Sequence, residues 1–237
     1  MTPERFAKGM TFDDYVKFIG SPENLQREGF DIRRFALAKP RVDWSAYLRE
    51  RHAKARLSDE QTAAITWLAA QPGGPAKVLV ISEEWSSDCR RDVPMLARLA
   101  EAGGLELRIF RRDGQHFSKS HHPTLAEAPD SNADIMAEFL NTKNGQTWQS
   151  IPVAVFYTKS HEYLYHYTEY PAIYHKDRVV AQIRATKPGE GKDEAQTRGD
   201  RDFRGLQESP FFQVWASAGV DEILSSLHRR LLLGPSA

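Results

Sequence analysis

The chain has 237 residues, of which 41% are hydrophobic and 11% aromatic, enough for one domain with additions or a domain with a small partner. Its 32 lysines and arginines balance its 32 aspartates and glutamates, so the formal net charge is zero. Nucleic acids and membrane surfaces usually attract proteins with a basic excess, so this balance argues against both kinds of partner. A single cysteine excludes an intrachain disulfide and a metal cluster built on several cysteines of one chain.

The first eight residues contain no apolar core of signal-peptide length, and no later segment is apolar enough over its length to span a bilayer. We therefore expect a soluble, cytoplasmic protein without a membrane partner. The lone cysteine is consistent with a reducing compartment. No cofactor is expected, and the sequence predicts no particular oligomeric state.

Residues 1–57 are expected to form a helical extension that packs on the core of the protein. Thr11 can cap a helix that ends at Gly20, and Ser21–Pro22 can begin a second, shorter helix. Asp43 can cap a third helix. Nothing in this segment indicates a separate functional domain.

Residues 58–185 alternate helices with strands, the order typical of an α/β domain with parallel neighbouring strands. Ser58 can cap the first helix, with Gln61 at the capping-box position. The residues of this helix expected to face inward are Ala64, Trp67 and Leu68. The expected strands cover residues 77–81, 105–110, 153–158 and 163–167, and the helices between them cover 89–102 and 134–140.

The last expected strand follows a tight reversal at Ser160, so it should run antiparallel to the strand before it. Alternation along this strand predicts a row of tyrosines on one face of the sheet, formed by Tyr163, Tyr165 and Tyr167. We interpret the row as sheet packing.

The C-terminal part is expected to be helical around one polar segment. A helix over residues 171–183 should cover the sheet. Residues 186–205 are rich in charge, glycine and glutamine and have almost nothing apolar, which predicts a flexible insertion. Residues 206–237 should form C-terminal helices, one beginning at Ser209–Pro210 and a last one over 220–232.

Residues 112–132 form a polar loop that contains adjacent histidines, His121 and His122. Neighbouring histidines can bind metals, but no carboxylate or third histidine stands at helical spacing from this pair. A solvated loop is therefore the preferred interpretation, and no metal site is expected.

The stretch from Val78 to Pro94 carries the candidate chemistry. It begins as an apolar run of strand length, turns after Trp85, and continues as a helix whose first turn holds Cys89. A helix N-terminus lowers the pKa of a thiol, and neighbouring arginines act in the same direction, whereas neighbouring aspartates oppose them. Farther along, Pro152 precedes a strand that looks central, and a cis bond at Ile151–Pro152 would explain its position.

These residues resemble the thioredoxin-like superfamily, in particular its bacterial members with a Trp-Cys-x-Asp-Cys site behind a helical N-terminal extension. The matching elements, in family order, are Val78–Ile81, Trp85, Asp88, Cys89, the helix through Val93–Pro94 and Leu96, Asp134–Leu140, and Ser150–Ile151–Pro152. The resemblance covers about residues 58 to 185. It implies a three-layer α/β/α fold with a mixed central sheet.

One departure from the family pattern decides the expected mechanism. Ser86 stands where the family has its attacking cysteine, and Cys89 matches only the second, resolving cysteine. Dithiol exchange needs one thiolate to attack and a neighbouring thiol to release the mixed disulfide. A serine hydroxyl does neither near neutral pH, so dithiol exchange is expected to be lost.

Several functions stay open for this site. Cys89 can serve as a monothiol that forms a mixed disulfide with a small thiol, or it can be a packed side chain without redox function. A peroxidase is disfavoured, because peroxiredoxins carry a proline where this chain has Ser82. The resemblance also implies a binding module for an extended peptide or protein partner. The binding residues would then be Trp85, Ser86, Ser87, Asp88, Ile151 and Pro152.

Overall fold

The computed structural model describes residues 1–29 and 39–234. At its centre lies a four-stranded sheet in the order β4-β3-β7-β8. The strands are β3 (Lys77–Ser82), β4 (Glu106–Arg111), β7 (Val153–Tyr157) and β8 (Tyr163–Thr168). β3 and β4 run parallel, whereas β7 is antiparallel to both of its neighbours, so the predicted mixed sheet is confirmed. The inner strands β3 and β7 are apolar runs buried on both faces.

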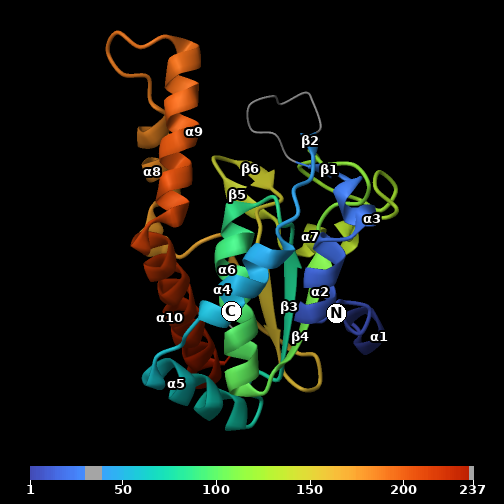
Figure 1. Ribbon diagram of the computed structural model, residues 1–237. Coiled ribbons are helices and arrows are strands. Elements are labelled where there is room, and N and C mark those ends of the chain that lie inside the picture. The colour runs from blue at the N-terminus through green and yellow to red at the C-terminus, as the bar shows by residue number, and fades with distance from the viewer. Residues whose placement is uncertain (30–38, 235–237) are drawn as a thin grey trace.

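Helix α6 (Ser87–Gly103) lies against one face of the sheet and is covered by other helices (Figure 1). It packs against α4 (Ser45–Lys54), α5 (Asp59–Ala70) and α10 (Pro210–Leu233). Every residue from Asp88 to Ala97 is buried, which is unusual for a helix start that carries several charges. Gly104 ends the helix in the left-handed region at φ 64°, the conformation that favours glycine.

Helix α10 is one continuous element, so the prediction of two separate C-terminal helices is wrong. Its start at Ser209–Pro210 is confirmed. Gly219, near the middle, faces the sheet: a Cβ there would lie 3.1 Å from the Tyr167 hydroxyl. The absence of a side chain therefore lets α10 lie close to β8.

Helix α5 begins with the predicted capping box, in which Ser58 and Gln61 bond reciprocally. Its buried stripe is formed by Gln61, Ile65 and Leu68. The expectation that Trp67 faces inward is wrong, since its side chain is 50% exposed and lies beside His228 of α10.

The predicted row of three tyrosines on β8 is also wrong. An irregularity in the pairing at Phe156 and Tyr157 inserts one residue into β8, so Tyr163 changes face relative to Tyr165 and Tyr167. Tyr163 instead lies beside His166, with its hydroxyl 2.8 Å from the Nδ1 atom of that ring. Tyr167 points toward α6 and α10, and His166 points toward Phe139 on the opposite face. The sheet is thus covered on both sides, and the three-layer fold is confirmed.

The N-terminal segment covers the edge of the sheet that is formed by β4. It contains α1 (Pro3–Phe6), α2 (Phe12–Ile19), α3 (Pro22–Leu25) and two short paired strands, β1 (Glu28–Gly29) and β2 (Lys39–Pro40). Thr11 and Ser21 cap α2 and α3 as predicted. The prediction of Asp43 as the cap of α4 is wrong: the N-cap is Trp44, and the Asp43 carboxylate accepts from the Ser45 amide at 2.8 Å instead. Met10 and Ile109 exchange two backbone hydrogen bonds, so the edge strand β4 has a partner.

The segment between β4 and β7 contains the predicted polar loop and a short helix, α7 (Ala133–Glu138). A small hairpin follows, formed by β5 (Asn141–Lys143) and β6 (Gln146–Trp148). The His121 ring lies 5.0 Å from the ring of Trp148 in this hairpin, and its Nδ1 atom is 2.6 Å from the Thr147 carbonyl oxygen.

The helices after β8 differ most from expectation. The predicted helix over residues 171–183 is divided at His175, which has φ 48°, into η1 (Ala172–Tyr174) and α8 (Lys176–Arg184). α8 has no buried residue and packs on α9 (Lys192–Glu208) rather than covering the sheet. α9 occupies most of residues 186–205, so the segment predicted as a flexible insertion is largely helical. We call residues 176–208 the arm, because α8 and α9 project together beyond the end of the sheet (Figure 1).

Candidate functional site

The turn from Trp85 to Cys89 joins β3 to α6, as the sequence predicted. Ser86 is the N-cap of α6: its hydroxyl accepts from the Cys89 amide at 3.4 Å, and its own amide donates to the Glu83 carbonyl at 3.1 Å. Its side chain therefore completes the helix start, the ordinary role of serine at this position. Ser86 is buried, whereas Trp85 and Ser87 on either side of it are partly exposed.

Cys89 lies beneath this turn with 1% of its surface exposed. Burial raises the pKa of its thiol to about 12, and hydrogen bonds to Ser82, the Glu83 backbone and Ser86 offset only part of that effect. The Tyr15 hydroxyl, from α2, lies 3.0 Å from the Ser82 hydroxyl, and both side chains are buried. The thiol is therefore protonated and covered at neutral pH.

Asp88 is buried between two cations. Arg91 of the same helix donates to it at 2.7 Å, and Lys176 of the arm donates to its other carboxylate oxygen. Lys176 also lies 3.3 Å from the Glu169 carboxylate, which in turn accepts from Lys143 at 3.0 Å. These bonds connect the first turn of α6 to the residues that follow β8.

A second carboxylate, Asp92, lies one turn farther along α6. Burial raises the pKa of Asp92 to about 6 although Arg91 donates two hydrogen bonds to its carboxylate. The Tyr167 hydroxyl donates a third at 3.1 Å. Asp92 is thus a buried carboxylate whose ionisation reaches into the mildly acidic range.

The loop before β7 has the cis Ile151–Pro152 bond that the sequence suggested. Both residues are buried. The Pro152 carbonyl accepts from the Glu169 amide at 2.7 Å, and the Glu169 carbonyl accepts from Arg91 at 3.0 Å. The proline loop and the start of α6 are therefore joined through the backbone of Glu169.

Trp85 forms the accessible rim of the site. Its ring lies 5.6 Å from the ring of Phe117, and the guanidinium of Arg112 lies about 5 Å from both rings. Arg112 also donates to the Gln149 carbonyl, three residues before Pro152, at 3.1 Å. The structure thus brings Trp85, through Arg112, close to the chain segment that leads into the proline loop.

A buried charge network under the turn was missed from the sequence. Glu83 accepts from Arg27 and from the Asp113 amide, each at 2.8 Å, and Arg41 donates to both Glu83 and Glu84. Burial alone would raise the pKa of Glu83, but the two arginines hold it below its ordinary value. Burial and the neighbouring Glu83 raise the pKa of Glu84.

The signal that could have revealed this network is the pair Glu83–Glu84 directly after a fully apolar strand. Two carboxylates at that position have to be paired if the strand end is buried. Their arginine partners lie 42 to 56 residues earlier in the chain, in loops where an arginine looks like a solvated charge.

Within residues 1–29 and 39–234, no group of three or more histidine, cysteine, aspartate or glutamate side chains is arranged to hold a metal ion. None of the helices in this part of the chain has the length and apolar composition of a membrane span.

Sequence comparison agrees with this architecture. The family model described as Thioredoxin matches residues 36–184, more than half of the chain, and the protein belongs to this family. The match contains β3, the turn with Ser86 and Cys89, the cis-proline loop and β8. The arm beyond residue 184 and α10 lie outside it. No curated protein matches the chain.

Two solved structures resemble the whole chain. A protein of unknown function from Pseudomonas aeruginosa has 12% identity and a TM-score of 0.50, covering 94% of this chain and 95% of its own. An HIV epitope-scaffold has 15% identity and a TM-score of 0.47, covering 95% and 96% respectively. At this identity the first likeness concerns the fold alone.

Proposed function

We propose that this chain is a non-catalytic member of the thioredoxin family, which binds a partner at the rim of the Trp85–Cys89 turn and does not cycle thiols. The observation that carries the proposal is the state of Cys89. Its thiol is buried and protonated, and the hydroxyl of Ser86 is used to cap α6.

Every redox alternative for this site needs an accessible thiolate. A monothiol that forms mixed disulfides and a peroxidase that attacks peroxide both use the deprotonated sulfur. With a pKa of about 12, roughly one Cys89 thiol in 10⁵ is ionised at pH 7. Because the sulfur is buried, small thiols and peroxide do not reach even that fraction. This argues against both the monothiol and the peroxidase function.

The accessible side chains of the site favour binding. Trp85 and Ser87 are partly exposed, and Phe117 and the buried Arg112 support the Trp85 ring. Tryptophan is among the residues that most often dominate the energy of protein interfaces. We infer that the partner presents an extended segment to this rim, the mode in which backbone hydrogen bonds supplement a few side-chain contacts.

The redox half of the proposal is tested by the reactivity of Cys89. The folded protein should react with an aromatic disulfide reagent at least 100-fold more slowly than the urea-unfolded chain, and low-dose peroxide with glutathione should leave its mass unchanged. An adduct that forms at near-stoichiometric oxidant and is missing from Cys89→Ala would overturn it. Ser86→Cys provides a matched control, because it places a thiol at the N-cap of the same helix.

The binding half is tested by comparing two tryptophans. Partners captured by the wild-type protein should be lost with Trp85→Ala and kept with Trp67→Ala, which removes an exposed tryptophan from α5. Equal loss or equal retention with the two variants would contradict binding at the rim.

A further inference from the structure

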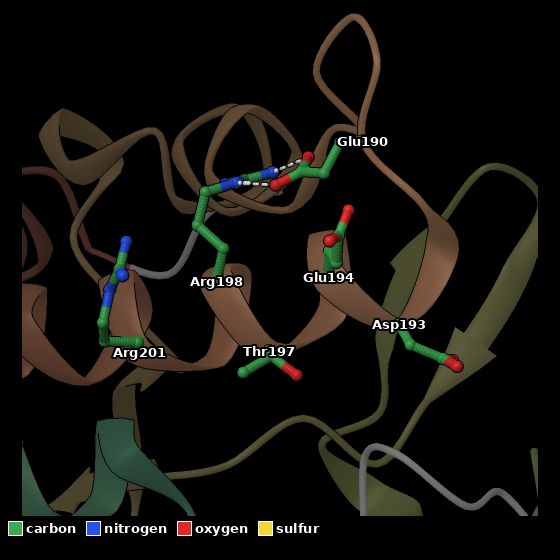
Figure 2. Close-up of a pocket in the computed structure, with 6 residues that line it drawn as sticks. All are labelled: Glu190, Asp193, Glu194, Thr197, Arg198 and Arg201. Atoms are coloured by element: carbon green, nitrogen blue, oxygen red, sulfur yellow. Dashed lines mark hydrogen bonds and ion pairs between the residues drawn. The ribbon is translucent and has the colours of Figure 1, made fainter.

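Hydrogen bonds within the arm hold its two helices and their connecting loop together. Arg198 of α9 donates to the Ile183 and Ala185 carbonyls at 2.7 Å and to both carboxylate oxygens of Glu190 (Figure 2). These bonds fasten the loop between the two helices to α9. Gly199 allows α8 to approach, since a Cβ there would lie 3.3 Å from the Arg184 side chain. The two helices therefore form one unit.

This unit is only lightly packed on the rest of the protein. α8 has no buried residue, and α9 has only the small residues Ala195 and Gly199 buried. Among the described residues, the apolar contact between the arm and the body lies at the root of the arm, which is the place where α8 begins and α9 ends. There Val179 and Leu206 pack against the cluster of Tyr174, Phe212 and Trp215. Segments with so little buried apolar surface open locally at small free-energy cost.

Both ends of the arm touch the first turn of α6. At the start of α8, Lys176 donates to Asp88 and lies 3.3 Å from Glu169. At the end of α9, Gln207 accepts from Arg90 at 3.2 Å. Asp88 and Arg90 flank Cys89 in sequence, and both are buried in this position of the arm.

A third polar contact lies beside this root. Asp177 is 3.4 Å from Lys143 of the β5–β6 hairpin, which also pairs with Glu169. The polar contacts of the arm with the body thus gather at one place, next to the candidate site.

The chain leaves the regular helices at both connections between arm and body. His175, just before α8, holds a left-handed conformation at φ 48°, which non-glycine residues adopt infrequently. Ser209, between α9 and α10, is extended at φ −74° and ψ 159°. Two adjacent breaks of this kind allow two helices to turn together while α10 stays in place.

We propose that the arm is a lid on the site: it turns as a unit about His175 and Ser209, and its closed position keeps Asp88 and Arg90 from a partner. Opening breaks the Lys176–Asp88 and Gln207–Arg90 contacts and uncovers the side of Asp88 and Arg90 that faces the arm, while Arg90 keeps its bonds to the Glu84 and Trp85 carbonyls. The role of the uncovered surface rests on the proposed binding function, whereas the opening itself is a property of the chain alone.

Hydrogen exchange of the full chain, read by mass spectrometry, tests the lid without a partner. In the wild-type protein, amides of residues 178–206 should exchange at least 100-fold faster than those of β3. Lys176→Ala should accelerate exchange at least threefold in the arm and in residues 86–92 together. Lys192→Ala, at the far end of the arm, is the matched control and should leave residues 86–92 unchanged.

Gln207→Ala loosens the other contact and should act on the same two segments. Exchange of the arm as slow as that of β3 would overturn the proposal. A Lys176→Ala effect confined to the arm, or one spread uniformly over β3 and β7 as in global destabilisation, would overturn it too. Failure of the Trp85 comparison would reject binding at the rim while leaving these exchange rates as they are.

Discussion

The turn after β3 and the arm both depend on ion pairs, yet the surroundings of these pairs differ. Under the turn, the paired side chains of Arg27 and Glu83 are 0% and 1% exposed. In the arm, the side chains of Arg198 and Glu190 are 12% and 15% exposed, and they join two helices that bury almost no residue in the body. The first kind of pair is part of the core, and the second holds a local loop.

The contribution of an ion pair to stability therefore depends on how deeply the pair is buried. Removing one member of a buried pair leaves the other charge without water or partner, which is strongly destabilising. A pair that borders solvent, as Arg198–Glu190 does, loses less when one member is removed, because the other side chain can turn to water. The two regions should therefore respond differently to the same substitution.

The largest expected effect is at Glu83. Glu83→Gln keeps the shape but leaves Arg27 with a weaker acceptor, and we expect a loss of about 3–5 kcal/mol in the free energy of unfolding. Urea unfolding with an unchanged m-value measures it. The matched variant Glu190→Gln should keep the wild-type midpoint, and equal losses for the two variants would break the comparison.

Asp92 should make stability depend on acidic pH. Its pKa is about 6 in the folded protein against an ordinary 3.8, so the folded state holds this proton more tightly. The contribution of Asp92 is then fully present below about pH 4 and is lost as the pH rises to 6, by about 3 kcal/mol in total. Urea unfolding over this range should show a downward slope in wild type relative to Asp92→Asn. Parallel profiles would contradict the raised pKa.

Cys89 should have a similar influence at alkaline pH. The unfolded chain releases the thiol proton near the ordinary value of 9.0, whereas the folded protein keeps it to about 12. The contribution of the protonated Cys89 thiol to the free energy of unfolding is therefore lost as the pH rises from 9 to 12, and about 1.4 kcal/mol of it is lost by pH 10. The stability difference between wild type and Cys89→Ala, measured at pH 7.5 and 10, should shrink by that amount. A constant difference would indicate an accessible thiol of ordinary pKa.

The smallest effect is expected in the arm. Glu190→Gln weakens the bonds from Arg198, so hydrogen exchange should accelerate in residues 185–191. The global unfolding midpoint should stay at its wild-type value. A shift of the midpoint would show that the arm contributes to the core after all.

Most of the fold could be predicted because its signals are local. Apolar runs mark β3 and β7, Ser58 with Gln61 marks the start of α5, and the order of elements identifies the thioredoxin family. The failures are also local in origin. Helix α9 was not predicted because its sequence is polar and contains glycines. Its start is stabilised by the Glu194 carboxylate, which accepts from the Gly191 amide at 3.0 Å. A single inserted residue in β8 moved Tyr163 to the other face.

The local structure of the candidate site could be predicted, but its surroundings could not. The structure has the predicted turn from Trp85 to Cys89 at the start of α6 and the predicted cis bond before Pro152. What surrounds the turn depends on distant residues, such as Tyr15, which bonds to Ser82, and Lys176, which bonds to Asp88; spacing along one sequence carries no information about them. Burial is the quantity that decides thiol chemistry, and it is a tertiary property.

The bonds of Arg27 also determine when the N-terminal segment can be secured during folding. Arg27 reaches Glu83 across 56 residues of chain and the Asp113 and Gly114 carbonyls across 86 and 87. Contacts of such separation form late, because the intervening loop has to be closed first. We therefore expect Arg27 to stay in water until β3 and β4 have paired, and the segment that carries it to be fixed late in folding.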